Sequence, residues 1–411
     1  MELSGLSGLY RSLDPVATVY LEARSPSEDA ATQVTLRWHD LAEQLRTAGA
    51  DEGTLAAIDA TVKDNEYGWQ QGTGRVVVAS SAGVLLDAAL DAAQGAGDEA
   101  YWTTLPQLGR YLREQARICR ELLIVADKEG ATVSELLVSP DNGTSEVGDR
   151  ELQQRSGSEV HKPRGGALSN RRIQNRAEEA VLRQADEVIE HVEGATRRFR
   201  PDAIVLAGSV PARTAIRDEL PAHLRALVVE TEHGARAAGA SEQPLDDELR
   251  AVADRIAADR GADALERLGS QQAHGLAAQG VWSITLAAQT GAIATLLLDD
   301  NHPVGDQLWV GPEPHHVSVN SEALAALDVD EPVEVDAESA LVRCAAATGA
   351  DLSTVPGTSA WTHSTPADSL SAAGSDSKGL NPDSSEAAGP ESADSPLTEG
   401  VGALLRFDPG L

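Results

Sequence analysis

The alternation of apolar and polar positions predicts a chain that mixes strands with helices. The stretch VATVYLEA, which begins after Pro15, alternates like a half-buried strand. Residues 30–47 and 54–62 carry apolar positions at helical spacing. RVVVAS and GVLLDAAL then predict a strand pair that turns around Ser80–Gly83. These elements together predict a small first α/β unit.

A second unit is predicted to begin with a helix and a hairpin. The helix, over Pro106–Arg120, carries Arg110, Arg113, Arg117 and Arg120 at helical spacing, with Glu114 as the acidic residue among them. This pattern fits either a solvated helix face or a second basic patch. The following run, ELLIVADKEGATVSELLV, predicts two strands joined by a turn at Asp127–Gly130.

The second unit continues with alternating strands and helices. A polar stretch over Ser139–Glu159 leads to a basic stretch and a long helix, and then to the buried strand AIVLAG at Ala203–Gly208. Ser209 and Pro211 open a further helix before the strand ALVVE. Gly208 and Ser209 can cap this helix or hold an anion at its start. Such alternation is typical of an α/β domain.

The rest of the chain predicts a third unit. It contains a long helix (DDELRAVADRIAADRGADALERL), a helix near 281–290, the strands GAIATLLLDD, QLWVG and DLSTV, a helix over Glu338–Gly349, and a last strand, GVGALLRF. Residues 358–399 are rich in Ser, Asp, Pro, Gly and Ala, which predicts disorder. We therefore predict an α/β (α+β) fold of three domains, at 1–115, 116–235 and 236–411, with a disordered loop near 358–399 in the third.

The strongest candidate for chemistry is the basic stretch HKPRGGALSNRRIQNR, at 161–176. It carries five positive side chains and no acidic one, although the chain has 33 Lys+Arg against 65 Asp+Glu and a formal net charge of -32. A basic island in an acidic chain indicates an anionic partner. Paired glycines leave the backbone free to approach that partner closely. The candidate binding residues are His161, Lys162, Arg164, Gly165, Gly166, Arg171, Arg172 and Arg176.

Three interpretations of this stretch remain open from the residues alone. It can be a solvated loop followed by a charged helix face. It can be a phosphate cradle, although neither GxxxxGK[ST] nor GxGxxG is present. It can also be a loop that projects into RNA, with the arginines on phosphates.

Composition narrows the setting in which the protein works. Its two cysteines, Cys119 and Cys344, offer neither a disulfide framework nor a CxxC metal site, so we expect a reducing cytosol and no metal or cofactor. The sequence has no signal-like start and no long apolar run, so we expect neither secretion nor a membrane span. The acidic charge argues against general nucleic-acid coating, and any RNA contact is therefore expected to be local.

Four motifs, taken in order, resemble the archaeo-eukaryotic class I release factor and Pelota superfamily. GGALSNRR corresponds to its Gly-Gly-Gln loop and arginine-bearing helix, and VLAGS to a strand ending in Leu-Ala-Gly-Ser. TGAIATLLL and GVGALLRF correspond to two strands of its third domain. More narrowly, the chain is similar to a prokaryotic branch with Vms/ANKZF-type peptidyl-tRNA hydrolases, mycobacterial release-factor-like proteins and Balon-like hibernation factors.

The resemblance implies a fold, partners and a role. The middle domain would be RNase H-like, and the third would be an L30e-like module that contacts a translational GTPase. The chain, a monomer, would occupy the ribosomal A site near the peptidyl transferase centre, with tRNA as a further possible contact. We find no Asn-Ile-Lys-Ser-like stop-codon motif, so stop-codon reading is not expected.

One departure from the superfamily bears directly on catalysis. Release factors use the Gln after Gly-Gly to position water at the peptidyl-tRNA ester, and here that position is Ala167, whose side chain can neither donate nor accept a hydrogen bond. Gln174 is the nearby alternative, eight residues past Gly166. Basic residues without the hydrolytic Gln favour binding, in ribosome hibernation or rescue, over hydrolysis of peptidyl-tRNA.

Overall fold

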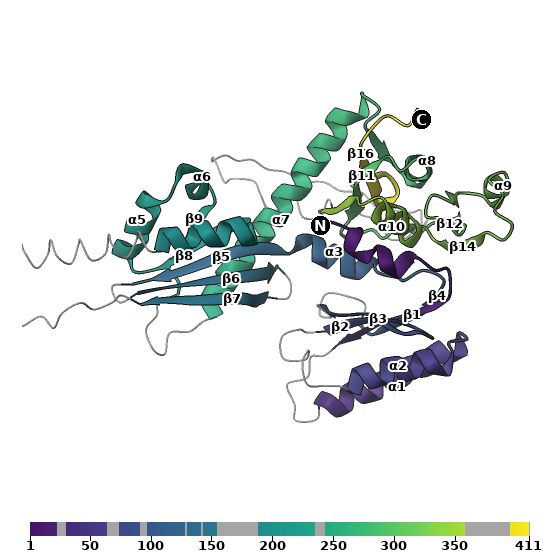
Figure 1. Cartoon of the computed structure of the whole chain (residues 1–411), viewed down its shortest axis with the longest axis horizontal. Coiled ribbons are helices and arrows are strands. Elements are labelled where there is room, and N and C mark those ends of the chain that lie inside the picture. Colours follow the sequence, from purple (N-terminus) through teal and green to yellow (C-terminus); the bar gives the residue numbers. More distant parts are fainter. Residues whose placement is uncertain are drawn as a thin grey trace, which may run out of the picture. The chain divides into compact units, whose positions relative to one another are not determined.

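The computed structural model describes residues 1–22, 30–63, 74–90, 97–127, 130–140, 143–153, 188–234, 243–357 and 395–410. The chain divides into two compact units, one made of Met1 with Gly8–Arg260 and the other of Glu2–Ser7 with Gly261–Leu411. Both units combine helices with sheets (Figure 1), so the predicted mixed α/β class with several sheets is confirmed. The division into three domains, with boundaries after 115 and 235, stays a prediction.

The N-terminal sheet is antiparallel, with strand order β3-β2-β1-β4. Two helices cover one face of this sheet (Figure 1), and Trp38 is among the apolar side chains that they pack on it. The expected helices and the strand pair are confirmed. The sequence did not predict β4, which pairs with β1, because its five residues are too few to show an alternating pattern. The elements are η1 (Ser4–Tyr10), β1 (Val16–Glu22), α1 (Ala30–Thr47), α2 (Glu52–Lys63), β2 (Gly74–Ser80), β3 (Gly83–Leu90) and β4 (Glu99–Thr103).

The helix expected over Pro106–Arg120 is shorter than predicted. It is α3 (Gly109–Arg117), and it ends because Ile118 is extended and the chain enters a strand at Cys119. Three of the four arginines therefore lie in the helix, and the fourth, Arg120, does not. Arg110 donates to Gly97 O (2.9 Å) and lies over the Tyr20 ring, while Arg117 bonds Asp254 (2.9 Å) and Arg120 belongs to the strand.

The middle sheet has strand order β7-β6-β5-β8-β9. β5 pairs antiparallel with β6 and parallel with β8, so the predicted hairpin and buried strand are confirmed. The stretch expected to be a polar lead-in contains β7, which pairs only with β6; an edge strand can carry polar side chains on both sides. The strands are β5 (Cys119–Ala126), β6 (Gly130–Ser139), β7 (Gly143–Gln153), β8 (Ala203–Gly208) and β9 (Val228–Glu230).

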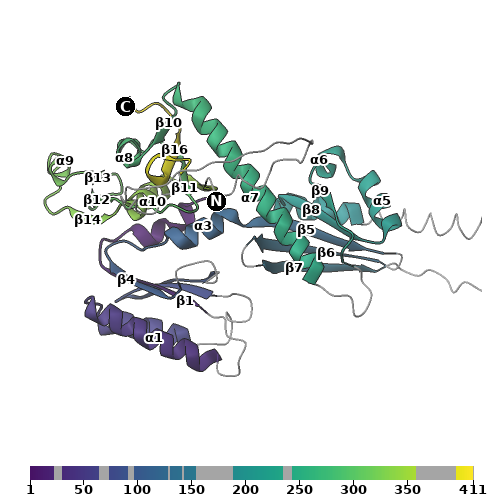
Figure 2. The same cartoon turned by 180° about the vertical axis from the view of Figure 1, so that it is seen from behind.

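Helices cover both faces of the middle sheet. A helix at 188–199, α5 (Val210–Glu219) and α6 (Ala222–Arg225) pack on the face that carries Leu122 and Ile124. The first half of α7 (Gln243–Gln272) packs on the other face, as Figure 2 shows. Since α7 runs past Arg260, it also supplies residues to the second unit.

The second unit contains two sheets, ordered β10-β16-β11-β15 and β13-β12-β14. The predicted strands and the two predicted helices are confirmed. The elements are β10 (Ala277–Gln279), α8 (Val281–Gln289), β11 (Ile293–Asp299), β12 (Gln307–Val310), β13 (Val317–Ser318), α9 (Ser321–Ala325), β14 (Val333–Asp336), α10 (Ala337–Ala347), β15 (Asp351–Val355), η4 (Thr398–Gly400) and β16 (Val401–Leu405).

Most of the stretch predicted to be disordered, 358–399, lies outside the described residues, and the structure describes it only from residue 395 onward. Its last residues are packed. Ser395 Oγ donates to Asp299 Oδ2 (2.6 Å), and the Leu397 side chain is buried. The apolar side chain of Leu397, rare in this polar stretch, joins the core of Leu268 and Leu404.

Candidate functional site

The predicted binding and catalytic residues lie outside the described part of the chain. This holds for His161, Lys162, Arg164, Gly165, Gly166, Arg171, Arg172 and Arg176, and also for Ala167 and Gln174. The structure does describe both places where the segment 154–187 leaves the middle sheet. These two places are the described positions on either side of the basic stretch.

The first departure point is the end of β7. Gln153 pairs with Gly130, and Ala126 pairs with Ala131, so β7 ends at the edge of the sheet where β5 ends. β8 is parallel to β5 and ends at the same edge, with Gly208 opposite Ala126. We call this edge, where β5 and β8 end, the carboxyl edge of the middle sheet.

The second departure point is the start of the helix at 188–199. Near its far end, Phe199 O accepts a hydrogen bond from Arg120 Nη1 (3.5 Å), close to the beginning of β5. Twelve residues of helix span about 18 Å. Because Val188 and Val192 pack on the sheet, that length carries the start of the helix toward the carboxyl edge. The end of β7 and the start of this helix therefore lie on the same side of the sheet.

The turn from β8 into α5 explains the Leu-Ala-Gly-Ser motif. Gly208 has φ +104°, and a Cβ at this position would meet the backbone carbonyl oxygen of Ala126. Ser209 N donates to that same oxygen (2.9 Å), which fixes the turn against β5. Only glycine satisfies both the backbone conformation and the close approach. Ser209 occupies the N-cap position of α5, but its side chain makes no capping hydrogen bond.

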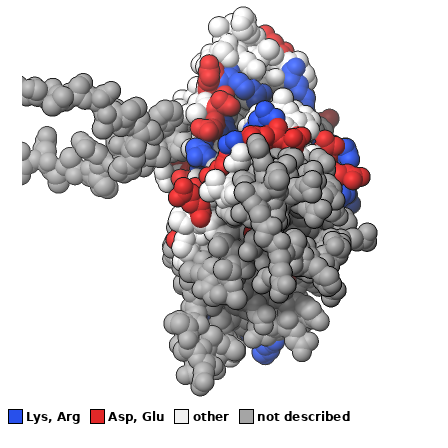
Figure 3. Space-filling model, turned by 90° about the vertical axis from the view of Figure 1, so that its left-hand side faces the viewer, with Lys and Arg blue, Asp and Glu red and all other residues white. Residues whose placement is uncertain are grey.

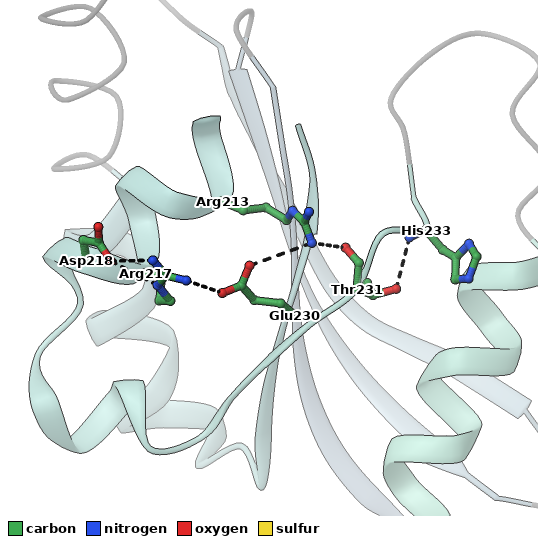
Figure 4. A network of polar contacts seen from close by, with 6 residues as sticks. All are labelled: Arg213, Arg217, Asp218, Glu230, Thr231 and His233. Atoms are coloured by element: carbon green, nitrogen blue, oxygen red, sulfur yellow. Dashed lines mark hydrogen bonds and ion pairs between the residues drawn. The ribbon is translucent and has the colours of Figure 1, made fainter. Parts of the chain in front are cut away.

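A network of arginines and carboxylates joins α5 to the residues after β9 (Figure 4). Arg213 is only 7% exposed, and its Nη1 donates to Thr231 O (2.6 Å) and lies 3.8 Å from Glu230 Oε2. Arg217 Nη1 donates to Glu230 Oε1 (2.9 Å), and Asp218 accepts from the same guanidinium. These bonds fix the loop after β9 beside α5.

The network is electrostatically balanced. The two arginines, Arg213 and Arg217, face the two carboxylates, Asp218 and Glu230. The hydrogen bonds that Arg217 donates to Asp218 and Glu230 raise the pKa of Arg217, so this arginine stays charged. Figure 3 looks onto this side of the protein and shows Lys and Arg interleaved with Asp and Glu. The network fixes the loop after β9 beside α5, and it does not form a positively charged surface.

Sequence reasoning missed two buried polar residues of the middle domain. Arg213 lies in a helix whose sequence, VPARTAIRDE, reads as a solvated surface helix. Glu121 opens an apolar strand, and its side chain is fully buried. The one sequence signal that could have indicated the burial of Arg213 or Glu121 is a charged residue close to a predicted buried strand.

Two further classes of site, metal sites and membrane spans, concern the described part of the chain. Among those residues, no three His, Cys, Asp or Glu side chains gather as metal ligands would. None of the described helices combines the length and the apolar character that a membrane crossing requires.

Residues 120–274 match the family model described as "Bacterial archaeo-eukaryotic release factor family 2". The matched stretch contains the middle sheet except Cys119, together with the carboxyl edge and α7. The predicted resemblance to the archaeo-eukaryotic release factors is thereby confirmed, and the protein is release-factor-like.

The chain is also similar to two proteins of Mycobacterium tuberculosis, Rv2629 of strain H37Rv and MT2704 of strain CDC 1551. Each is 23% identical over 372 residues, which cover 86% of this chain and 92% of the relative.

Three solved structures show similarity at low identity. The archaeal translation termination factor aRF1 is 14% identical, with 98% of this chain and 97% of that chain covered and a TM-score of 0.24. Archaeoglobus fulgidus Pelota is 14% identical, with 82% and 80% covered and a TM-score of 0.32. Dom34 of S. cerevisiae is 10% identical, with 79% and 74% covered and a TM-score of 0.35.

Proposed function

We propose that this release-factor-like protein is a cytosolic ribosome-binding factor that occupies the A site of idle or stalled ribosomes without reading stop codons. The observation that carries the proposal is the basic stretch at 161–176, which lies inside the family-matched residues and has Ala167 where release factors have Gln. In this proposal the positive side chains of the stretch bind RNA phosphates, and the Gln side chain that would position water at the ester is replaced by that of Ala167.

The setting of the stretch supports the same proposal. The described residues on either side of it, the end of β7 and the start of the helix at 188–199, lie on the side of the middle sheet that carries the balanced network of Arg213 and Glu230. A fixed base limits the conformational entropy lost when a projecting segment binds. In this proposal the stretch reaches rRNA near the peptidyl transferase centre, and the third domain, L30e-like, contacts an elongation-type GTPase.

Hydrolysis of peptidyl-tRNA is the second candidate function. The family description names release factors, and Gln174 offers an amide within the same stretch. In this alternative Gln174 positions the water that attacks the ester. One assay separates the two functions, because ribosomes that carry a labelled peptidyl-tRNA report both binding and release.

The binding test replaces Arg171, Arg172 and Arg176 by Glu. Each lost phosphate contact is expected to lower the slope of log affinity against log salt by about one. The triple variant should melt like the wild type, since exposed charges contribute roughly 0–1 kcal/mol each, and should fail to pellet with ribosomes. No peptide should be released by the wild type or by Gln174→Ala.

A matched control carries the same change in charge elsewhere. Arg11, Arg46 and Arg267 are exposed residues outside the middle domain, and their replacement by Glu should leave pelleting close to wild type. Equal pelleting of the two triple variants at one salt concentration contradicts the proposal. Release that disappears in Gln174→Ala would instead establish the hydrolase.

A further inference from the structure

Glu121 lies in the interior of the middle domain, under α7. It pairs with Leu136 on β6 and with Ala203 on β8, in the centre of the sheet. Residues two apart on a strand share a face, so Glu121 lies on the face of Cys119 and Leu123. That face is covered by Leu249, Val252 and Ala253 of α7.

The Glu121 carboxyl group has no hydrogen-bond partner among the described residues. Its side chain is 0% exposed, and both Oε1 and Oε2 are buried and unbonded. Two other buried carboxylates in the described chain differ in this respect. Asp299 accepts from the backbone of Asn301 and from Ser395, and Glu338 accepts from Val304 N. A buried polar group without a partner is costly and calls for an explanation.

The charged groups around Glu121 do not neutralise it. Arg260 of α7 pairs with Asp202 (2.5 Å), and Arg117 pairs with Asp254 (2.9 Å). Arg255 of α7 attracts the carboxylate from an exposed position, while Asp202 repels it. The remaining titratable neighbour, Cys119, has a pKa raised to about 12 by burial, so it stays neutral. On β6, the residues opposite Cys119, Glu121 and Leu123 are Val138, Leu136 and Ser134, and none of these carries a charge.

Burial, and then the charge of Asp202, raises the pKa of Glu121 from 4.5 to about 8. The docked state therefore keeps its proton at pH values where a solvated carboxyl has lost it. Each pH unit between the two values favours an opened state, in which water reaches the carboxylate, by a factor of about ten. Opening therefore increases as the pH rises and levels off above the folded pKa.

We propose that Glu121 is a proton-dependent latch: residues 243–260 of α7 stay packed on the middle sheet while its carboxyl is neutral, and its ionisation releases them. Because α7 continues at Gly261 into the second unit, release alters the helix that links the two units. This role is independent of what the basic stretch binds.

Hydrogen–deuterium exchange of the full chain tests the latch. Exchange of peptides from 243–260 is compared near pH 5.5 and near pH 7.5, after division by the intrinsic exchange rate at each pH. The wild type should show about 100-fold more opening at the higher pH. Glu121→Gln, which cannot ionise, should show no such rise. Peptides from the helix at 188–199, on the opposite face, should stay equally protected in both proteins.

The control is Glu338→Gln, which removes the charge of a buried carboxylate in the second unit and should keep the wild-type pH profile over 243–260. The same profile in wild type and Glu121→Gln overturns the latch. If Glu121→Gln does not fold, the wild type still decides the question, because equal protection of 243–260 at both pH values overturns it.

Discussion

The two faces of the middle sheet are built from the same strands but differ in chemistry. The face under the helix at 188–199 is aliphatic, with Leu122, Ile124 and Leu206 fully buried. The face under α7 also has an aliphatic core, but Cys119 and the unbonded carboxyl of Glu121 interrupt it. An aliphatic face stabilises the fold at every pH, whereas burial of a carboxyl without partners costs free energy, and that cost rises with pH as the carboxyl ionises.

The packing on the first face is therefore expected to be independent of pH, and the packing on the second face is expected to depend on pH. β8 supplies Ile204 and Leu206 to the first face and Ala203 and Val205 to the second. The position of β8 therefore matters to both faces, while Glu121 matters to one. We therefore expect the largest loss of stability from a substitution that acts on both faces, a smaller effect from one that acts on a single face, and the smallest from one at the carboxyl edge.

The largest effect is expected from Gly208→Val. The new Cβ would meet the backbone of Ala126, and a β-branched residue strongly disfavours a φ of +104°. Both faces lose their alignment when β8 shifts, so we expect a cost above about 4 kcal/mol. Thermal unfolding followed by circular dichroism measures it.

Gly269→Ala is the matched control for that substitution. Gly269 lies in α7 with no atom within 4 Å of the position of a new Cβ. Alanine in a helix is favoured over glycine by about 1 kcal/mol, so this variant should be as stable as the wild type or more stable. A Gly208→Val protein that melts with Gly269→Ala would show that the β8 turn tolerates a side chain.

Local patterns predicted most of the secondary structure and failed where long-range contacts decide. Ala203–Gly208 reads as a buried strand from its own residues, and it is one. The burial of Glu121 depends on α7, more than 120 residues later in the chain, and no local pattern reveals it. The bond from Arg213 to Thr231 likewise joins a helix to a loop 18 residues away. The basic stretch itself stays a prediction from sequence.

The next effect concerns one face. Glu121→Leu replaces the carboxyl by an apolar group, which suits its surroundings of Leu123 and Val252. In the wild type the unfolded chain loses the proton above pH 4.5 and the folded chain only near 8, so wild-type stability falls across that range. The advantage of the variant should grow with pH up to about 8, to a few kcal/mol. Urea unfolding at a series of pH values checks this, and a constant difference would contradict it.

The smallest effect is expected at the carboxyl edge, from Arg217→Ala. The Arg217 side chain is 39% exposed, and its ion pairs with Asp218 and Glu230 are open to solvent. Exposed ion pairs contribute little to stability, so the midpoint of urea unfolding should stay close to that of the wild type.

Arg213→Ala supplies the contrast at the same edge, because Arg213 is buried and bonds Thr231 O. Its removal leaves that carbonyl without this donor and should cost about 1–3 kcal/mol. Equal losses in the two variants would mean that Arg217 is as important to the network as the buried arginine. A loss confined to Arg213 would show that the buried bond holds the loop after β9, while the outer pairs only balance its charge.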